Sequence, residues 1–262
     1  MSNIDLSEKT VLLTNDDGID GEGLISLEKT LSSFGATVCV LAPSSNQSGV
    51  SSKLTMKLPL SFCRVKKSEK SEWISCSGTP VDCVISALLS PIFGQKKFDA
   101  VISGINKGAN LGTDVIYSGT CAAARQATLY GFPGIALSVE SYDNTWKFDA
   151  LSEFCAKNLE KLISLCTSDV FVSVNASSAD IYNGVGFASP SIRDYRDRMT
   201  IVSDPNGRND VFYGFFGEGL IQSARRRLEQ TEDDCSLSKR GFISVTRFFA
   251  EPAFLDEGGS SF

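Results

Sequence analysis

Residues 10–18 read TVLLTNDDG, an apolar run that passes directly into two aspartates and a glycine. The β-branched and leucine-rich half is typical of a buried strand. Asp16 and Asp17 then stand at the carboxyl end of that strand, the edge at which parallel sheets bind their ligands. Adjacent carboxylates repel each other, and a divalent cation is the partner that best offsets their charge. The stretch therefore predicts an α/β fold with a metal site.

Strand-like and helix-like segments alternate through the first two-thirds of the chain. The spacing of apolar residues predicts a helix over residues 22–34, and Thr79 followed by Pro80 predicts the start of a helix that ends near residue 89. We expect further helices from residue 118 or 120 to 130 and over residues 148–166. The remaining strands are expected at residues 36–42, 99–103, 132–139 and 170–174, and residues 54–65 and 72–76 are expected to form strands or a hairpin. This alternation indicates a mostly parallel sheet covered by helices.

The last third of the chain has a different character. From about residue 183 it is rich in glycine, proline, aromatic residues and clustered charge, with strand patterns at residues 212–216 and 241–249. We interpret residues 1–182 as an α/β core and residues 183–262 as a β-rich carboxyl-terminal extension. We expect one α/β core with an extension attached to it, not two independent domains.

Composition excludes several classes of function. The net charge of −6 argues against a stable nucleic-acid partner, which needs a basic surface. The chain has no histidine, so an imidazole base, nucleophile or zinc ligand is excluded. Eight cysteines without a CxxC pair indicate a reducing setting. A polar start without a signal peptide and the lack of a membrane-length apolar run lead us to expect a cytoplasmic protein with no membrane partner.

Three polar segments follow expected strands and so converge at one edge of the sheet. They are residues 15–17, 46–49 and 104–106, and together they offer carboxylate, hydroxyl and amide oxygens. This hard-oxygen set suits Mg²⁺, Mn²⁺ or Ca²⁺. A Ser-Gly-Thr at residues 118–120 opens an alanine-rich helix, and a helix start of this kind binds phosphate. A cation beside an anion pocket suits hydrolysis of a phosphate ester.

Each of these features also has a simpler interpretation. Asp-Asp-Gly alone is more often a solvated turn, and Ser118 and Thr120 are also good helix N-caps. Asp82, early in its helix, is best explained as a complement to the helix dipole. The joint occurrence of the features at one edge favours a site.

Four segments resemble the survival protein SurE family of metal-dependent 5'/3'-nucleotidases: VLLTNDDGIDGEGL, LAPSSNQSG, SGTPVDCV and DAVISGINKGANLGTDVIYSGTCAAA. They occur in order over residues 11–138, and GFISVTRF at residues 241–248 is similar to the closing strand of the family. The resemblance implies a Rossmann-like core and a 5'-nucleotidase that hydrolyses nucleoside monophosphates with one divalent cation, Mg²⁺ or Mn²⁺. It also implies a homodimer or homotetramer built partly through a carboxyl-terminal hairpin that the subunits exchange.

The same resemblance assigns roles to individual residues. It places the metal ligands on Asp16, Asp17, Ser48 and Asn106, and we expect Asp16 and Asp17 to be the catalytic residues. It places the phosphate contacts on Asn110, Ser118, Gly119 and Thr120.

Two alternatives stay open from the sequence. Many relatives carry an acid and a base where this chain has Ser44 and Ser45, so a polyphosphatase or broader phosphoester phosphatase is an alternative within enzymes. A non-catalytic nucleotide- or metal-sensing module is the alternative outside them. The sequence also leaves open whether water or an aspartate attacks the phosphorus.

Overall fold

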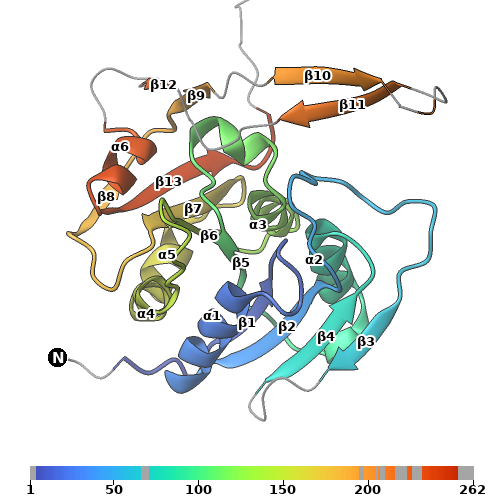
Figure 1. Cartoon of the computed structure of the whole chain (residues 1–262). Helices are drawn as coiled ribbons and strands as arrows, with labels where there is room; N and C mark the ends of the chain where they lie inside the picture. The colour runs from blue at the N-terminus through green and yellow to red at the C-terminus, as the bar shows by residue number, and fades with distance from the viewer. Residues whose placement is uncertain are drawn as a thin grey trace, which may run out of the picture.

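A nine-stranded sheet forms the centre of the molecule, with helices on both of its faces (Figure 1). The computed structural model describes residues 4–65, 71–194, 198–203, 206, 210–215, 223–225 and 232–252. The strand order is β3-β4-β2-β1-β5-β6-β7-β13-β8. The predicted α/β class with a mostly parallel sheet is confirmed.

Six neighbouring strands run parallel to one another. In spatial order they are β4 (Glu72–Cys76), β2 (Thr37–Pro43), β1 (Thr10–Thr14), β5 (Ala100–Lys107), β6 (Gly134–Glu140) and β7 (Val170–Ser177). They are rich in valine, isoleucine and leucine and mostly buried, as expected of strands covered on both faces.

Antiparallel pairing appears only toward the two edges of this sheet. On one side β3 (Phe62–Val65) pairs antiparallel with β4. On the other, β13 (Ile243–Phe249) pairs antiparallel with β7, and β8 (Val185–Phe187) pairs parallel with β13. Strands from beyond residue 183 thus complete the central sheet, while the predicted division of the chain at that point stays a prediction.

The helices divide between the two faces according to the alternation of the strands. Val11 and Leu13 of β1 lie in the cluster under α1 (Glu22–Ser33), α4 (Asp149–Lys157) and α5 (Leu159–Leu165). Leu12 lies in the cluster under α2 (Pro80–Leu89) and α3 (Gly119–Leu129). Within the described residues, no helix combines the length and the apolar character that crossing a bilayer requires.

Shorter elements fill the connections and the carboxyl-terminal part. They are η1 (Pro91–Phe93), η2 (Gly112–Ile116), β9 (Ile192–Asp194), β10 (Arg198–Ser203), β11 (Asp210–Phe215), β12 (Ser223–Arg225) and α6 (Asp234–Lys239). The strands β10 and β11 form an antiparallel hairpin apart from the main sheet (Figure 1). The expected strand at 212–216 falls largely on β11, but Phe216 lies outside the described residues.

Two expected elements differ from the structure for local reasons. The helix expected over residues 148–166 is two helices that meet at Asn158, where the side-chain amide (2.9 Å) and the backbone N–H (3.0 Å) both donate to the Phe154 carbonyl. Only residues 62–65 of the strand expected at 54–65 are extended in the sheet. The backbone N–H of Thr55 is instead bound by Asp82 (3.0 Å).

The order of the strands places a crevice at the carboxyl ends of β1 and β5. From β1 the chain moves outward through β2 and β4, then returns to β5 on the other side of β1. Such a switch point is where open α/β sheets bind ligands. Asp16 and Asp17 follow β1 there, and Asn106 lies near the end of β5.

Candidate active site

Asp16 is bound directly by the start of α3. Its carboxylate accepts hydrogen bonds from the Thr120 hydroxyl (2.6 Å to Oδ1) and the Thr120 backbone N–H (3.2 Å to Oδ2). Gly119 comes so close that an added Cβ would lie 2.9 Å from the Asp16 Cβ. The structure therefore joins the expected metal-binding acid to the expected phosphate-binding helix start.

Asp17 joins the ends of β1 and β5. Its Oδ2 accepts the backbone N–H of Lys107 at 2.9 Å, which brings the neighbouring Asn106 to the same edge. The Asn106 amide nitrogen donates to the Gly108 carbonyl (2.8 Å), so its Oδ1 is the atom left to act as a ligand. Among the described residues, no hydrogen-bond donor contacts Asp17 Oδ1 or Asn106 Oδ1.

Burial makes both carboxyl groups harder to ionise than an exposed aspartate. Burial raises the pKa of Asp16 to about 6, and the charge of Asp17 adds to this, while the hydrogen bonds from Thr120 oppose it. Burial also raises the pKa of Asp17, against the Lys107 N–H. Raised pKa values in neighbouring acids are typical of functional sites, and a bound cation reverses such shifts.

Ser48 lies in an exposed turn that is bound to the backbone of Asp16. The Gln47 N–H donates to the Asp16 carbonyl (2.7 Å), and the Ser48 N–H donates to Asn46 Oδ1 (2.8 Å). Ser48 therefore directly follows a residue whose backbone is bound to that of Asp16.

These residues fit a hard divalent cation. In the described part of the chain, no group of three or more histidine, cysteine, aspartate or glutamate side chains gathers to hold a metal. A cation here would depend on two carboxylates completed by hydroxyl and amide oxygens, which is the donor set of Mg²⁺ and Mn²⁺.

The start of α3 uses its two hydroxyls within the protein. Ser118 is the N-cap, and its Oγ accepts the Cys121 N–H (3.0 Å), as the simpler interpretation expected. The Thr120 hydroxyl donates to Asp16. What this helix start presents to an anion is chiefly its positive end and the close backbone approach at Gly119.

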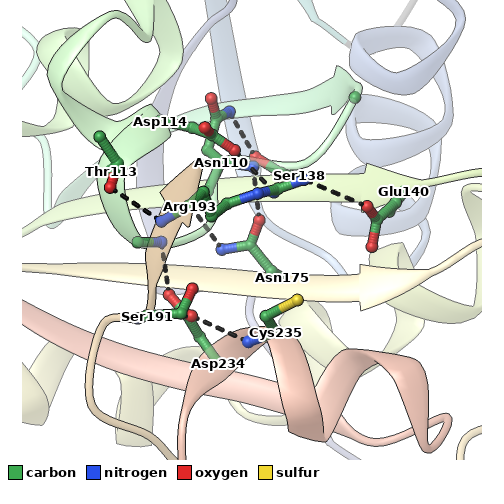
Figure 2. A network of polar contacts seen from close by, with 12 residues as sticks. Asn110, Thr113, Asp114, Ser138, Glu140, Asn175, Ser191, Arg193, Asp234 and Cys235 are labelled. Carbon is green, nitrogen blue, oxygen red and sulfur yellow. Dashed lines mark hydrogen bonds and ion pairs between the residues drawn. The ribbon is translucent and has the colours of Figure 1, made fainter. Parts of the chain in front are cut away.

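Asn110 is buried in a polar network between β6 and β7 (Figure 2). Its side-chain amide donates to the Ser138 hydroxyl (2.8 Å). Asn175 binds its backbone on both sides, accepting the N–H (2.8 Å) and donating to the carbonyl (3.1 Å). Sequence reasoning missed Ser138 and Asn175, although polar residues inside the apolar runs GIALSVE and VFVSVNAS were a usable signal.

Comparisons with known proteins agree with this architecture. Residues 11–197 match the family model described as survival protein SurE. The 5'-nucleotidase SurE of Treponema pallidum (strain Nichols) is 43% identical over 189 residues, which cover 70% of this chain and 98% of that protein. The 5'-nucleotidase SurE of Pseudothermotoga lettingae is 35% identical over 237 residues, 90% of this chain and 87% of that protein.

A solved structure extends the likeness to the fold. The crystal structure of the SurE protein from Aquifex aeolicus matches with a TM-score of 0.73 at 31% sequence identity. The match covers 93% of this chain and 94% of that one.

Proposed function

This chain belongs to the SurE family, and from that premise we propose that it is a divalent-metal-dependent phosphomonoesterase that hydrolyses nucleoside monophosphates to nucleoside and phosphate. The observation that carries the proposal is the contact between Asp16 and the start of α3. It sets an acid pair suited to a cation beside a helix end suited to phosphate.

The cation would be held by Asp16, Asp17, Ser48 and Asn106. When bound, Mg²⁺ or Mn²⁺ supplies the positive charge that polarises a phosphoryl oxygen and acidifies water. Two of the four, Asp17 and Asn106, are already oriented by backbone contacts to the end of β5.

The protein's own groups would bind and orient the phosphate. Thr120 fixes the Asp16 carboxylate through two hydrogen bonds, so that side chain needs no reorganisation when substrate arrives. Ser118 caps the start of α3, which begins at Gly119, so the positive end of α3 would receive the phosphate beside the loop that begins at Asn110. The attacking group is either water or one of the two carboxylates, and acid-trapping of a phosphorylated enzyme distinguishes them.

We also propose a cytoplasmic homodimer or homotetramer. All eight cysteines are free thiols, which suits a reducing compartment. The β10–β11 hairpin stands apart from the main sheet and is the candidate for exchange between subunits (Figure 1). Light scattering on the purified chain measures the mass that this proposal requires.

The decisive experiment measures phosphate release from a panel of nucleoside monophosphates with Mg²⁺, with Mn²⁺ and with chelator. We expect metal-dependent release that falls about a hundredfold or more in Asp17→Asn. Asp99→Asn is the matched control, because that carboxylate binds the Thr10 N–H (2.8 Å) at the opposite end of the strands.

Other outcomes of the panel separate the alternatives. Faster release from polyphosphate than from any nucleotide would favour the broader phosphatase. Tight nucleotide binding without release of phosphate under any metal would favour the non-catalytic sensing module over the enzyme. Activity that survives in both Asp16→Asn and Asp17→Asn would exclude the proposed mechanism.

A further inference from the structure

We propose that Asp234 and Arg193, from the carboxyl-terminal part of the chain, are positioning residues that hold the loop of residues 110–118 for phosphate binding. The proposal rests on the proposed function, because that loop leads into the helix start at Gly119. Neither residue belongs to the predicted metal or phosphate set.

Asp234 binds the loop by its backbone. The side chain is buried, and its Oδ2 accepts the Gly112 N–H at 2.7 Å. Its Oδ1 accepts the N–H groups of Ser191 (2.9 Å) and Cys235 (2.8 Å). One carboxylate thus ties the loop, the segment before β9 and the first turn of α6 to a single point (Figure 2).

The loop and the segment before β9 touch without room for a side chain between them. Gly112 has a φ of +51°, and a Cβ added there would lie 2.0 Å from the Ser191 carbonyl oxygen. The Asp234 hydrogen bonds therefore hold two backbones that are already in contact.

Arg193 binds the next two residues of the loop. Its backbone N–H donates to the Thr113 hydroxyl (3.1 Å), and its Nη1 lies 2.6 Å from Asp114 Oδ2. The guanidinium is 4% exposed and also faces Glu140 at the end of β6, with 3.6 Å between Nη2 and Oε1 (Figure 2). The buried guanidinium thus contacts two different carboxylates, and the loss of either would leave a buried charge less well compensated.

The contacts of Asp234 and Arg193 with the loop also position the start of α3, through hydrogen bonds of the loop backbone. The Asp114 carbonyl accepts the N–H groups of Tyr117 (3.0 Å) and Ser118 (3.1 Å), which places the N-cap of α3. The loop is therefore held by Asp234 and Arg193 on one side, while Thr120 is held by Asp16 on the other. Small displacements of such a loop cost catalysis heavily, because the phosphate must meet its contacts in register.

The test compares Asp234→Asn with Asp233→Asn in the full-length protein. Both change one aspartate at the start of α6, but the Asp233 carboxylate caps that helix through Ser236 (2.8 Å to its N–H). We measure kcat, KM, the inhibition constant of inorganic phosphate, and hydrogen–deuterium exchange in residues 112–120.

We expect Asp234→Asn to raise KM and the phosphate inhibition constant about tenfold and to speed exchange in residues 112–120. Asp233→Asn keeps a good N-cap residue, and we expect it to leave both constants and the exchange of that loop as in the unsubstituted chain. An effect of Asp234→Asn on melting temperature and kcat alone, with unchanged KM, inhibition constant and exchange, would overturn the proposal.

A second variant covers the case in which Asp234→Asn does not fold. Asp114→Asn weakens the contact with Arg193 from the loop side. We expect it to raise KM and the phosphate inhibition constant and to speed exchange in residues 112–120. If the unsubstituted protein releases no phosphate, the proposed function fails, but the exchange comparison still tests these contacts by itself.

Discussion

The loop that carries Ser48 and the loop that leads into α3 meet at Asp16, yet different parts of the chain anchor them. The first is bound at the start of α2, where Asp82 accepts the Thr55 hydroxyl (2.6 Å) across 27 residues of chain. The second is bound by Asp234, 122 residues after its contact at Gly112. One loop thus folds with its neighbouring helix, and the other depends on the packing of the carboxyl-terminal part.

This difference has a consequence for sensitivity to mutation. The local anchor is a capping box in which Thr79 and Asp82 bind each other's backbone N–H groups, so it forms with the helix itself. The remote anchor exists only when β9 and α6 have docked. We therefore expect the proposed phosphate-binding side of the site to respond to distant substitutions, and the proposed metal-binding side to be more self-contained.

The largest expected effect comes from Asp16→Asn, which acts where the two loops meet. The variant keeps the backbone contact with Gln47 but removes the charge that the Thr120 hydroxyl and N–H bind. We expect kcat/KM with a nucleoside monophosphate to fall about a hundredfold or more. The exposed Asp143→Asn is the control for the change in charge. Equal rates in the two variants would show that Asp16 is not part of the reaction.

A smaller effect, on the free energy of unfolding, tests how closely each of the two loops is packed. Gly49, in the Ser48 loop, has a φ of +73° and nothing within 4 Å of an added Cβ, whereas Gly112 would meet the Ser191 carbonyl. Gly49→Ala should cost about 1–2 kcal/mol of unfolding free energy for the backbone conformation alone. Gly112→Ala should cost about 3 kcal/mol or more, because the Cβ also forces the two backbones apart.

Urea unfolding of both alanine variants measures this difference at one pH. Equal costs would mean that the contact of the loop with the segment before β9 yields easily, and the contrast between the two anchors would then be lost. An excess cost in Gly112→Ala, accompanied by weaker binding of inorganic phosphate, would sharpen it.

The local anchor and the central strands could be predicted from the sequence because their patterns are short. Thr79 followed by Pro80 predicts the start of α2, and the apolar run before Asp16 predicts β1. Ser118 was recognisable as an N-cap. The sequence predicts only a complement to the helix dipole for Asp82, because Thr55, whose N–H and hydroxyl its carboxylate also binds, lies outside the helix pattern.

The remote anchor could not be predicted, because nothing in the sequence states which distant residues come together. Asp234 is one of several charged residues in a stretch for which the sequence predicts no element, and its contact with Gly112 exists only in the folded chain. Arg193 reads as one charge in a polar stretch, yet it is buried against Asp114. The interruption at Asn158 could not be predicted, because the apolar periodicity continues through it from α4 into α5.

The smallest expected effect is on the pH dependence of stability, because the pKa values of the two anchoring carboxylates are shifted in opposite directions. Burial raises the pKa of Asp82, but hydrogen bonds from Thr55 and Thr79 outweigh it and leave the pKa below the ordinary 3.8. For Asp234 burial raises the pKa above 3.8, against the hydrogen bonds from Ser191.

Linkage gives each anchor its own pH window. Ionised Asp82 stabilises the fold above pH 3.8, and this contribution is lost as the pH falls through its lower folded-state pKa. Asp234 takes up its proton at a higher pH in the folded protein than in the unfolded chain. The free energy of unfolding therefore rises as the pH falls from neutral toward 3.8. Asp82→Asn should therefore flatten the loss of unfolding free energy in strong acid, and Asp234→Asn should remove a gain at milder pH. Urea unfolding across this range, compared with the unsubstituted chain, measures both changes. Shifts of the same sign in the two variants would show that the anchors differ in chain distance but not in electrostatics.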